Sequence, residues 1–209
     1  NFALMPPDQS EVAERRQLPM RAFSNNAKLQ AQFELALCYI HGHGVQRNRR
    51  AAFILFRKTA MAGHLNAQFH LAICYDEGIG VAEDPKVAAS WYRRAATRGH
   101  ATSQWVLGAR YENGRGVKKD KRRAYQLYLK AAAQGVINAQ NRLGCLCEKG
   151  EGTSQSYKRA AGWYRLAAKR GEVNAQNNLG WLYLKGHGVR RDFPRAVHWL
   201  RKGARGGSA

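Results

Sequence analysis

The sequence predicts an all-α protein, a right-handed α-solenoid built from five helix-turn-helix repeats of 36 residues. The main observation is a Gly-x-Gly pair that recurs every 36 residues, because internal periodicity of this length is typical of solenoids. Small and apolar residues precede each pair at helical spacing, and a helix-capping residue follows it. The pairs are Gly42/Gly44, Gly78/Gly80, Gly114/Gly116, Gly150/Gly152 and Gly186/Gly188.

The first helix of each repeat, named helix A, is expected before the glycine pair. In the second repeat, Ala67, Leu71, Ala72 and Tyr75 recur at the spacing of one helix face. A polar residue near the start of four of these segments is expected to cap the helix. These expected caps are Asn66, Thr102, Asn138 and Asn174.

The second helix, named helix B, is expected to start after a capping residue four positions past each glycine pair. These caps are Asn48, Asp84, Asp120, Ser156 and Asp192. Pro85 and Pro194 suit a first helical turn, and a glycine is expected to close the helix at Gly63, Gly99, Gly135 and Gly171. The expected helix B windows are Arg49–Ala62, Pro85–Arg98, Lys121–Gln134, Tyr157–Arg170 and Phe193–Gly206.

The consensus of these copies reads Ala-x-x-x-Leu-Gly/Ala-x-x-Tyr-x-x-Gly-x-Gly-Val, then Asp-x-x-x-Ala-x-x-Trp-Tyr-x-x-Ala-Ala-x-x-Gly. It resembles the Sel-one-like (Sel1-like) repeat family, which is related to the tetratricopeptide repeat. The resemblance extends from Ala27 to Gly206, with local departures at Leu127, Cys147 and Ser156. It implies an α-solenoid that serves as an adaptor for other macromolecules, with helix A lining the concave wall.

Residues 1–26 lie outside the repeat and include Pro6, Pro7 and Pro19. We expect this segment to form an extended arm, with a short helix near Ser10–Gln17. Residues 27–209 form the predicted solenoid. Its repeats are expected at about 27–62, 63–98, 99–134, 135–170 and 171–206.

The chain has a formal net charge of +21, from 35 Lys and Arg residues against 14 Asp and Glu residues. The helix B windows hold 21 of those basic residues and no acidic residue, so the rest of the chain is formally neutral. Basic residues in a first helical turn oppose the helix dipole, so helix stability does not explain them. A polyanionic or acidic partner explains these basic residues.

The basic residues at the helix B starts and in the preceding loops are predicted to form one edge that binds nucleic acid or an acidic partner. They are Arg47, Arg49, Arg50, Arg115, Lys118, Lys119, Lys121, Arg122, Arg123, Lys158, Arg159, Arg190, Arg191 and Arg195. Phosphate contacts of this kind position a protein on RNA without reading its sequence. An acidic protein, an anionic membrane and a merely solvated face remain alternatives.

The favoured function is therefore a non-catalytic scaffold that docks onto RNA in a ribonucleoprotein, with an organellar, mitochondrial ribosome as the leading example. The alternative is a protein-protein adaptor that binds a peptide or an acidic protein on its concave face. In that case a glutamine column in helix A supplies possible contacts, although glutamine is also simply a good early helix residue. The column is Gln32, Gln68, Gln104, Gln140 and Gln176.

The sequence points to no enzyme, cofactor, metal site or small-molecule substrate. His43 aligns with Ile79 and Arg115, so the histidines follow the repeat and do not form a cluster. The Gly-x-Gly pairs follow helices, where a dinucleotide fingerprint follows a strand. Cys145 and Cys147 are expected to be small core residues, because they lack the spacing of a zinc site.

No apolar run is long enough for a transmembrane helix. The four cysteines lack a pairing pattern, with Cys38 and Cys74 one repeat apart, which favours a reducing intracellular compartment. Because the sequence starts at Asn1, we expect either a processed precursor or an excised fragment. Removal of a targeting segment would fit the mitochondrial matrix.

Overall fold

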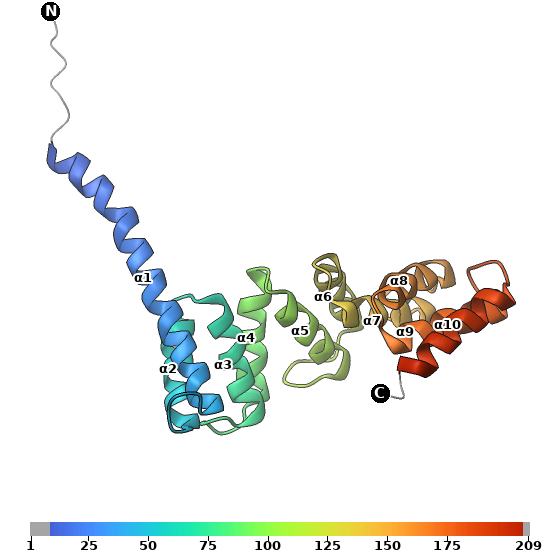
Figure 1. Ribbon diagram of the computed structural model, residues 1–209, viewed down its shortest axis with the longest axis horizontal. Helices are drawn as coiled ribbons and strands as arrows, with labels where there is room; N and C mark the ends of the chain where they lie inside the picture. Colours follow the sequence, from blue (N-terminus) through green and yellow to red (C-terminus); the bar gives the residue numbers. More distant parts are fainter. Residues whose placement is uncertain (1–8, 207–209) are drawn as a thin grey trace, which may run out of the picture. The chain divides into compact units, whose positions relative to one another are not determined.

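The computed structural model describes residues 9–206, with side chains from residue 25 onward, and in that range every regular element is a helix (Figure 1). The chain divides into two compact units, one ending at Glu83 and one beginning at Asp84. The first holds α1 (Gln9–His41), α2 (Arg49–Met61) and α3 (Leu65–Glu77). The second holds α4 (Pro85–Thr97), α5 (Ala101–Asn113), α6 (Lys121–Ala133), α7 (Ile137–Lys149), α8 (Tyr157–Lys169), α9 (Val173–Lys185) and α10 (Phe193–Gly206).

Within each unit, consecutive helices pack against one another, which is the nearest-neighbour packing of an all-α solenoid. Alanine and leucine from the helices pack in the core beside large rings such as Phe56, Tyr128 and Tyr164. Gly108 of α5 lies directly under the Tyr128 ring, because an added Cβ would stand 2.6 Å from Tyr128 Cε1. Small residues on helix A thus make room for the aromatic residue of helix B.

The helix B predictions are confirmed almost to the residue. Asn48, Asp84, Asp120 and Ser156 each accept a hydrogen bond from a backbone N–H in the first turn of the helix that follows. Asp192 does the same for α10, with Arg195 N 2.8 Å from Asp192 Oδ1. The side chain at one position of each repeat therefore fixes where helix B starts.

The Gly-x-Gly pairs are structural turns, as predicted. The first glycine ends helix A in the left-handed conformation, with φ of 66° at Gly78. The second glycine lies against the start of the preceding helix B, where a Cβ on Gly80 would overlap the carbonyl group of Arg49. Glycine at this second position lets two backbone segments of neighbouring repeats touch directly.

The predicted caps of helix A were wrong. The helices begin one residue before Asn66, Thr102, Asn138 and Asn174, so these residues lie in the first turn. The cap is the residue directly after the helix B closing glycine: His64, His100 and Glu172 accept a backbone N–H, and Val136 makes no side-chain bond. Asn and Thr are common capping residues and imidazole is an uncommon capping acceptor. The capping preferences therefore favoured the Asn and Thr column over the histidines two positions earlier.

The segment before the first repeat also differs from the predicted arm. Helix α1 runs from Gln9 to His41, so residues 9–26 continue the first helix A where an extended chain with a short helix was expected. Good helix formers such as Glu11, Ala13 and Glu14 outweigh the single internal Pro19. The part of the predicted arm before Gln9 lies outside the described residues.

The predicted concave-face contacts are also wrong for four of the five glutamines. Gln68, Gln104, Gln140 and Gln176 are only 4–7% exposed. Each side-chain amide donates to a carbonyl in the last turn of the preceding helix B, as Gln104 Nε2 does to Ala96 O at 3.1 Å. These four glutamines therefore satisfy carbonyl groups at the ends of helix B inside the fold. Gln32, the fifth residue of the column, is half-buried.

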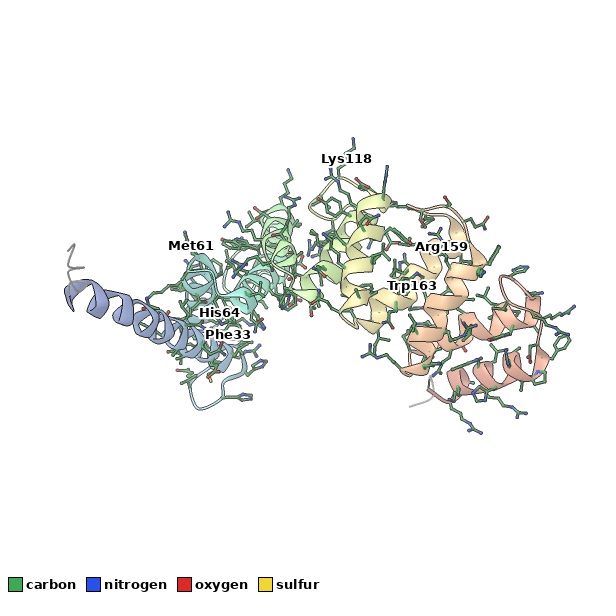
Figure 2. The ribbon with its side chains drawn as sticks, turned by 90° about the horizontal axis from the view of Figure 1, so that it is seen from above. Phe33, Met61, His64, Lys118, Arg159 and Trp163 are labelled. Atoms are coloured by element: carbon green, nitrogen blue, oxygen red, sulfur yellow. The ribbon has the colours of Figure 1, made fainter. Side chains whose placement is uncertain are left out.

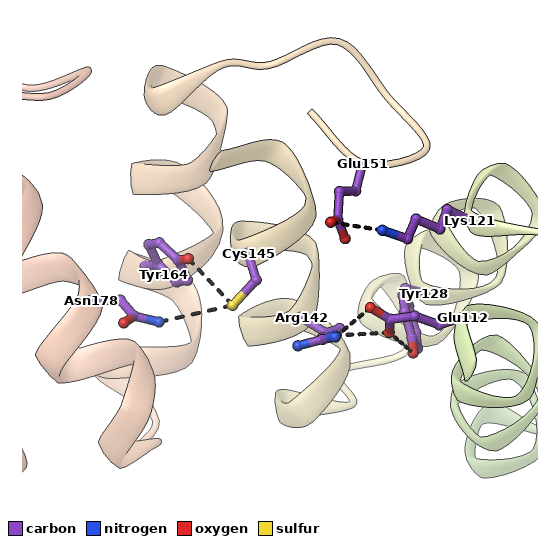
Figure 3. A network of polar contacts seen from close by, with 8 residues as sticks. All are labelled: Glu112, Lys121, Tyr128, Arg142, Cys145, Glu151, Tyr164 and Asn178. Carbon is purple, nitrogen blue, oxygen red and sulfur yellow. Dashed lines mark hydrogen bonds and ion pairs between the residues drawn. The ribbon is translucent and has the colours of Figure 1, made fainter. Parts of the chain in front are cut away.

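A buried carboxylate connects the third and fourth repeats (Figure 3). Glu112 of α5 accepts a hydrogen bond from Tyr128 Oη at 2.8 Å and from Arg142 Nε of α7 at 2.8 Å. An equivalent tyrosine-carboxylate bond joins Tyr164 to Glu148 at 2.7 Å in the fourth repeat. Lys121 and Glu151 form a second, more exposed ion pair between the third and fourth repeats at 2.7 Å.

Candidate functional site

The basic residues predicted at the helix B starts and preceding loops are exposed, except for Lys121, which is half-buried. In Figure 2, Lys118 projects from the loop between α5 and α6, and Arg159 projects from α8. These basic side chains are therefore accessible to a partner. Their exposure does not by itself say what that partner is.

Several of these basic side chains are engaged within the protein. Lys121 pairs with Glu151, and Arg50 Nη1 donates to Gly80 O at 3.0 Å. Arg191 Nε donates to Leu184 O at 3.2 Å, and Arg159 Nη2 donates to Thr153 Oγ1 at 3.1 Å. These four contribute to turns and repeat packing, so they are poorer candidates for partner contacts than the sequence indicated.

A groove is formed by residues of α4, α5 and α6. A cavity of about 420 Å³ is lined there by Ala96, Leu107 and Leu127 among others, and by the charged residues Arg93, Asp120, Arg122, Arg123 and Lys130. An adjoining cavity of about 390 Å³ shares Arg93 and Arg123. This groove therefore combines an apolar floor with cationic walls.

Two arginines converge on one phenol in this groove. Arg93 Nη2 of α4 lies 3.2 Å from Tyr111 Oη of α5, and Arg123 Nη1 of α6 lies 3.5 Å from the same oxygen. The guanidinium of Arg123 also lies 5.6 Å from the centre of the Tyr111 ring. Because the phenol oxygen accepts both bonds, its own proton is available for a ligand acceptor.

The same arrangement recurs two repeats later. Arg165 Nη2 of α8 lies 3.3 Å from Tyr183 Oη of α9, and the guanidinium of Arg195 of α10 lies 5.7 Å from the Tyr183 ring centre. A cavity of about 770 Å³ is lined by these three residues, together with Arg190 and Arg191. We name the two arrangements the Arg-Tyr-Arg sites of the third and fifth repeats.

Each Arg-Tyr-Arg site contains one acidic side chain, and that side chain is already occupied. Asp120 Oδ1 caps α6 through Arg123 N at 2.9 Å, and its Oδ2 lies 3.2 Å from Arg123 Nε. Asp192 makes the same two contacts with Arg195, at 2.8 and 3.4 Å. Among the residues that line the cavities, the positive charge therefore exceeds the negative charge in both sites.

The arginines also change the acidity of the two phenols. Partial burial acts to raise the pKa of Tyr111, but the hydrogen bonds and charges of Arg123 and Arg93 outweigh it and the pKa is lowered. Burial is likewise outweighed at Tyr183 by Arg165 and Arg195, so its pKa is also lowered. Both shifts report a positive potential at the phenol oxygen, which favours an anionic ligand.

The chain matches the Sel1 repeat in five consecutive segments, residues 29–64, 65–100, 101–136, 137–172 and 173–208. It belongs to the Sel1 repeat family. Proteins of this family are generally non-catalytic scaffolds for protein partners. A search of curated proteins gives no match.

Among solved structures, this Sel1 repeat protein is similar to c5321, described as a protective antigen of uropathogenic Escherichia coli with an SLR fold. The identity is 35% over 92% of this chain and 41% of that one, with a TM-score of 0.84. It is also similar to a Sel1 repeat protein from Oxalobacter formigenes, at 32% identity over 86% and 71% of the two chains, with a TM-score of 0.80. Our chain thus spans less than half the length of the first.

A putative Sel1 repeat protein from Klebsiella pneumoniae shares the fold alone, at 21% identity and a TM-score of 0.52, over 86% of this chain and 87% of that one. The Escherichia and Oxalobacter proteins support the five-repeat α-solenoid predicted from the glycine pairs.

The Arg-Tyr-Arg sites of this Sel1 repeat protein were not predicted from the sequence, although Arg123 and Arg195 are among the basic residues of the predicted edge. Arg93, Tyr111, Arg165 and Tyr183 were not selected. The signal that could have found them is a shared spacing, since Tyr follows Arg by 18 residues and the second Arg follows 12 residues later in both sites.

The cysteines in the structure are unpaired thiols. Cys147 is buried, as expected of a core residue, while Cys145 is half-buried with Tyr164 Oη 3.4 Å from its Sγ (Figure 3). Within the residues that the structure describes, no three His, Cys, Asp or Glu side chains are grouped closely enough to hold a metal ion. In the same range, none of the helices has the length and apolarity needed to cross a membrane.

Proposed function

We propose that this Sel1 repeat protein is a protein-protein adaptor that binds an acidic segment of its partner in the groove between α4 and α6. The observation that supports this proposal is the combination of cationic walls with an apolar floor in one cavity of about 420 Å³. An apolar side chain of a partner gains by burial against Leu107 and Leu127. An adjacent carboxylate gains from Arg93, Arg123 and the phenol proton of Tyr111.

RNA, the partner favoured by the sequence, fits this groove less well. Phosphate contacts need cationic donors and make no use of an apolar floor. The descriptions of the Escherichia and Oxalobacter structures name neither RNA nor a ribosome. The organellar ribosome and the mitochondrial matrix therefore remain predictions from the sequence alone.

The proposal is tested by fluorescence anisotropy with a labelled peptide that carries one Leu-Glu dipeptide. We expect binding that weakens with added salt, because the Debye length falls from about 30 Å at 0.01 M to about 10 Å at 0.1 M salt. The same peptide with Gln in place of Glu should bind less tightly. A short single-stranded RNA that binds more tightly than the acidic peptide would contradict the proposal.

A charge reversal locates the binding groove. Arg122→Glu places a negative charge in the lining of the cavity and should weaken peptide binding. Lys169→Glu in the last turn of α8 makes the same charge change at an exposed position away from the cavity lining, and should leave most of the binding intact. Equal losses in both variants would mean that the peptide responds only to net charge.

A further inference from the structure

The two Arg-Tyr-Arg sites occupy alternate repeats. The equivalent positions in the fourth repeat are Leu129, Cys147 and Arg159, so the phenol and one arginine are missing there. Arg159 donates instead to Thr153 Oγ1 and to Ser154 O. The second unit therefore presents two similar sites separated by a repeat that lacks one.

Both sites offer donors and no unused acid. In the third repeat, Arg93 and Arg123 direct their guanidinium groups at the oxygen of Tyr111, and Asp120 is engaged with Arg123 and the helix start. A ligand group placed beside Tyr111 must therefore be an acceptor. A carboxylate oxygen fits, because it can take the phenol proton and a guanidinium N–H together.

The two sites differ in the apolar residues beside the arginines, so a bound segment can distinguish one site from the other. The cavity of the third repeat is lined by Leu107 and Leu127 beside the cations. The cavity of the fifth repeat is lined by the exposed ring of Phe193 and by Pro194 at the start of α10, with Arg191 4.8 Å from the Phe193 ring centre. Each site thus has an apolar surface beside its phenol, formed by helix A and B residues in one and by the α10 start in the other.

From this arrangement we infer that the protein binds its partner at two points, with one acidic side chain in each Arg-Tyr-Arg site. The inference rests on the proposed adaptor function and specifies how the acidic segment is recognised. With the equivalent helices of successive repeats about 10 Å apart, two repeat steps separate the sites by about 20 Å. An extended peptide covers about 3.4 Å per residue, so the two acidic residues lie about six residues apart.

The inference is tested with a labelled extended peptide that carries two Leu-Glu dipeptides about six residues apart. A second peptide with the dipeptides about three residues apart spans only one repeat. We expect the longer peptide to bind at least tenfold more tightly than either the shorter one or a single-dipeptide peptide, because its second contact is intramolecular. Equal affinity of the two spacings would overturn the inference.

Conservative variants identify the groups. Tyr111→Phe and Tyr183→Phe each remove one hydroxyl, and each should weaken binding of the longer peptide about tenfold. The double variant should bind no more tightly than the unchanged protein binds the single-dipeptide peptide. Tyr75→Phe is the matched control, because Tyr75 occupies the same repeat position but Val87 replaces the second arginine.

The outcomes separate this inference from the proposed function. If the single-dipeptide peptide binds and Arg122→Glu weakens it, but both tyrosine variants bind the longer peptide unchanged, the two-site inference is wrong and the adaptor proposal stands. If neither peptide binds and RNA does, both are wrong. Circular dichroism melting of each variant establishes that it is folded. Arg93→Gln, an exposed change in α4, repeats the test by removing one guanidinium donor to Tyr111 Oη while the tyrosine itself stays in place.

Discussion

Arg142 of α7 binds the carboxylate of Glu112 of α5, thirty residues earlier in the chain, and so joins the fourth repeat to the third. The side chain of Glu112 is 6% exposed and that of Arg142 is 41% exposed. The hydrogen bond to Glu112 raises the pKa of the Arg142 guanidinium, against an opposing effect of burial. Removing one of the two hydrogen-bond donors of a buried carboxylate costs free energy of folding.

We therefore expect Arg142→Gln to destabilise the protein by about 1–3 kcal/mol, because Glu112 keeps only its bond from Tyr128. Lys121→Gln is the matched control, since it removes the more exposed ion pair with Glu151 at the same pair of repeats. The control should cost about 1 kcal/mol or less. Urea unfolding measures both, and a larger loss for Lys121→Gln would refute the ranking.

Two glycines in helix interiors should respond oppositely to alanine. Gly108→Ala places a Cβ 2.6 Å from Tyr128 Cε1 and should destabilise the protein by about 1–3 kcal/mol. Gly162→Ala in α8 meets nothing within 4 Å and should stabilise it by about 1 kcal/mol through helix propensity. Thermal melting compares the two, and a higher melting temperature for both variants would mean that the Tyr128 ring moves aside freely.

The unusual cap of α5 should make stability depend on pH. His100 Nδ1 accepts a hydrogen bond from Ser103 N at 3.1 Å, and burial lowers the pKa of the imidazole. The unfolded state then binds the proton more readily than the folded state, so stability falls as the pH drops through the unfolded pKa of about 6.5. The loss levels off below the folded pKa.

Asparagine at this position can cap the helix without titrating. We expect the melting temperature of His100→Asn to fall less than that of the unchanged protein between about pH 7.5 and about pH 5. The comparison cancels the other titrating groups, since both proteins share them. Parallel curves over this range would show that His100 does not contribute to the pH dependence.

The glutamine column should affect stability and not partner binding. Gln104→Leu removes the donor to Ala96 O and the acceptor of Gln134 Nε2, so it should cost about 1–3 kcal/mol. Binding of the Leu-Glu peptide should not change in the folded variant. Tyr111→Phe should behave in the opposite way, with weaker binding and little change in melting temperature. Weaker peptide binding by folded Gln104→Leu would restore the glutamines as contacts.

The cysteines should differ sharply in reactivity. Cys74 is 1% exposed, and burial, followed by the charge of Glu77, raises the pKa of its thiol to about 12. At about pH 8 only about one thiol in ten thousand is then a thiolate. Mass spectrometry after iodoacetamide treatment should find half-buried Cys38 modified well before Cys74. Equal rates in the folded protein would contradict this placement.

The helix B starts could be predicted because one residue type at one position decides them. Asp84 and Asp120 cap their helices through their own side chains, and a fixed offset from the glycine pair reveals them. The helix A starts could not be predicted in this way. There the acceptor is His64, His100 or Glu172, or is absent at Val136, so no single residue type marks the position.

The candidate site was predictable only in part. Exposed cations at helix starts are visible in a sequence, and Arg122 and Arg123 were found for that reason. The convergence of Arg93 and Arg123 on Tyr111 depends on three helices packing together, and the pattern occurs in only two repeats. The prediction that the glutamines contact a partner fails for a related reason. A residue that recurs in every repeat does not reveal whether its side chain faces solvent or the preceding helix.

The contact between each second glycine and the preceding helix B has a consequence for how this surface can change. Gly116, Gly152 and Gly188 meet backbone atoms of Pro85, Lys121 and Tyr157, so the step between these repeats is set by main chain against main chain. Side chains such as Lys121 and Glu151 add to that step, but the glycine contact itself involves no side chain of the outer surface. The repeats can therefore exchange one pattern of charges for another, and with it one partner for another, while the register of the fold stays the same.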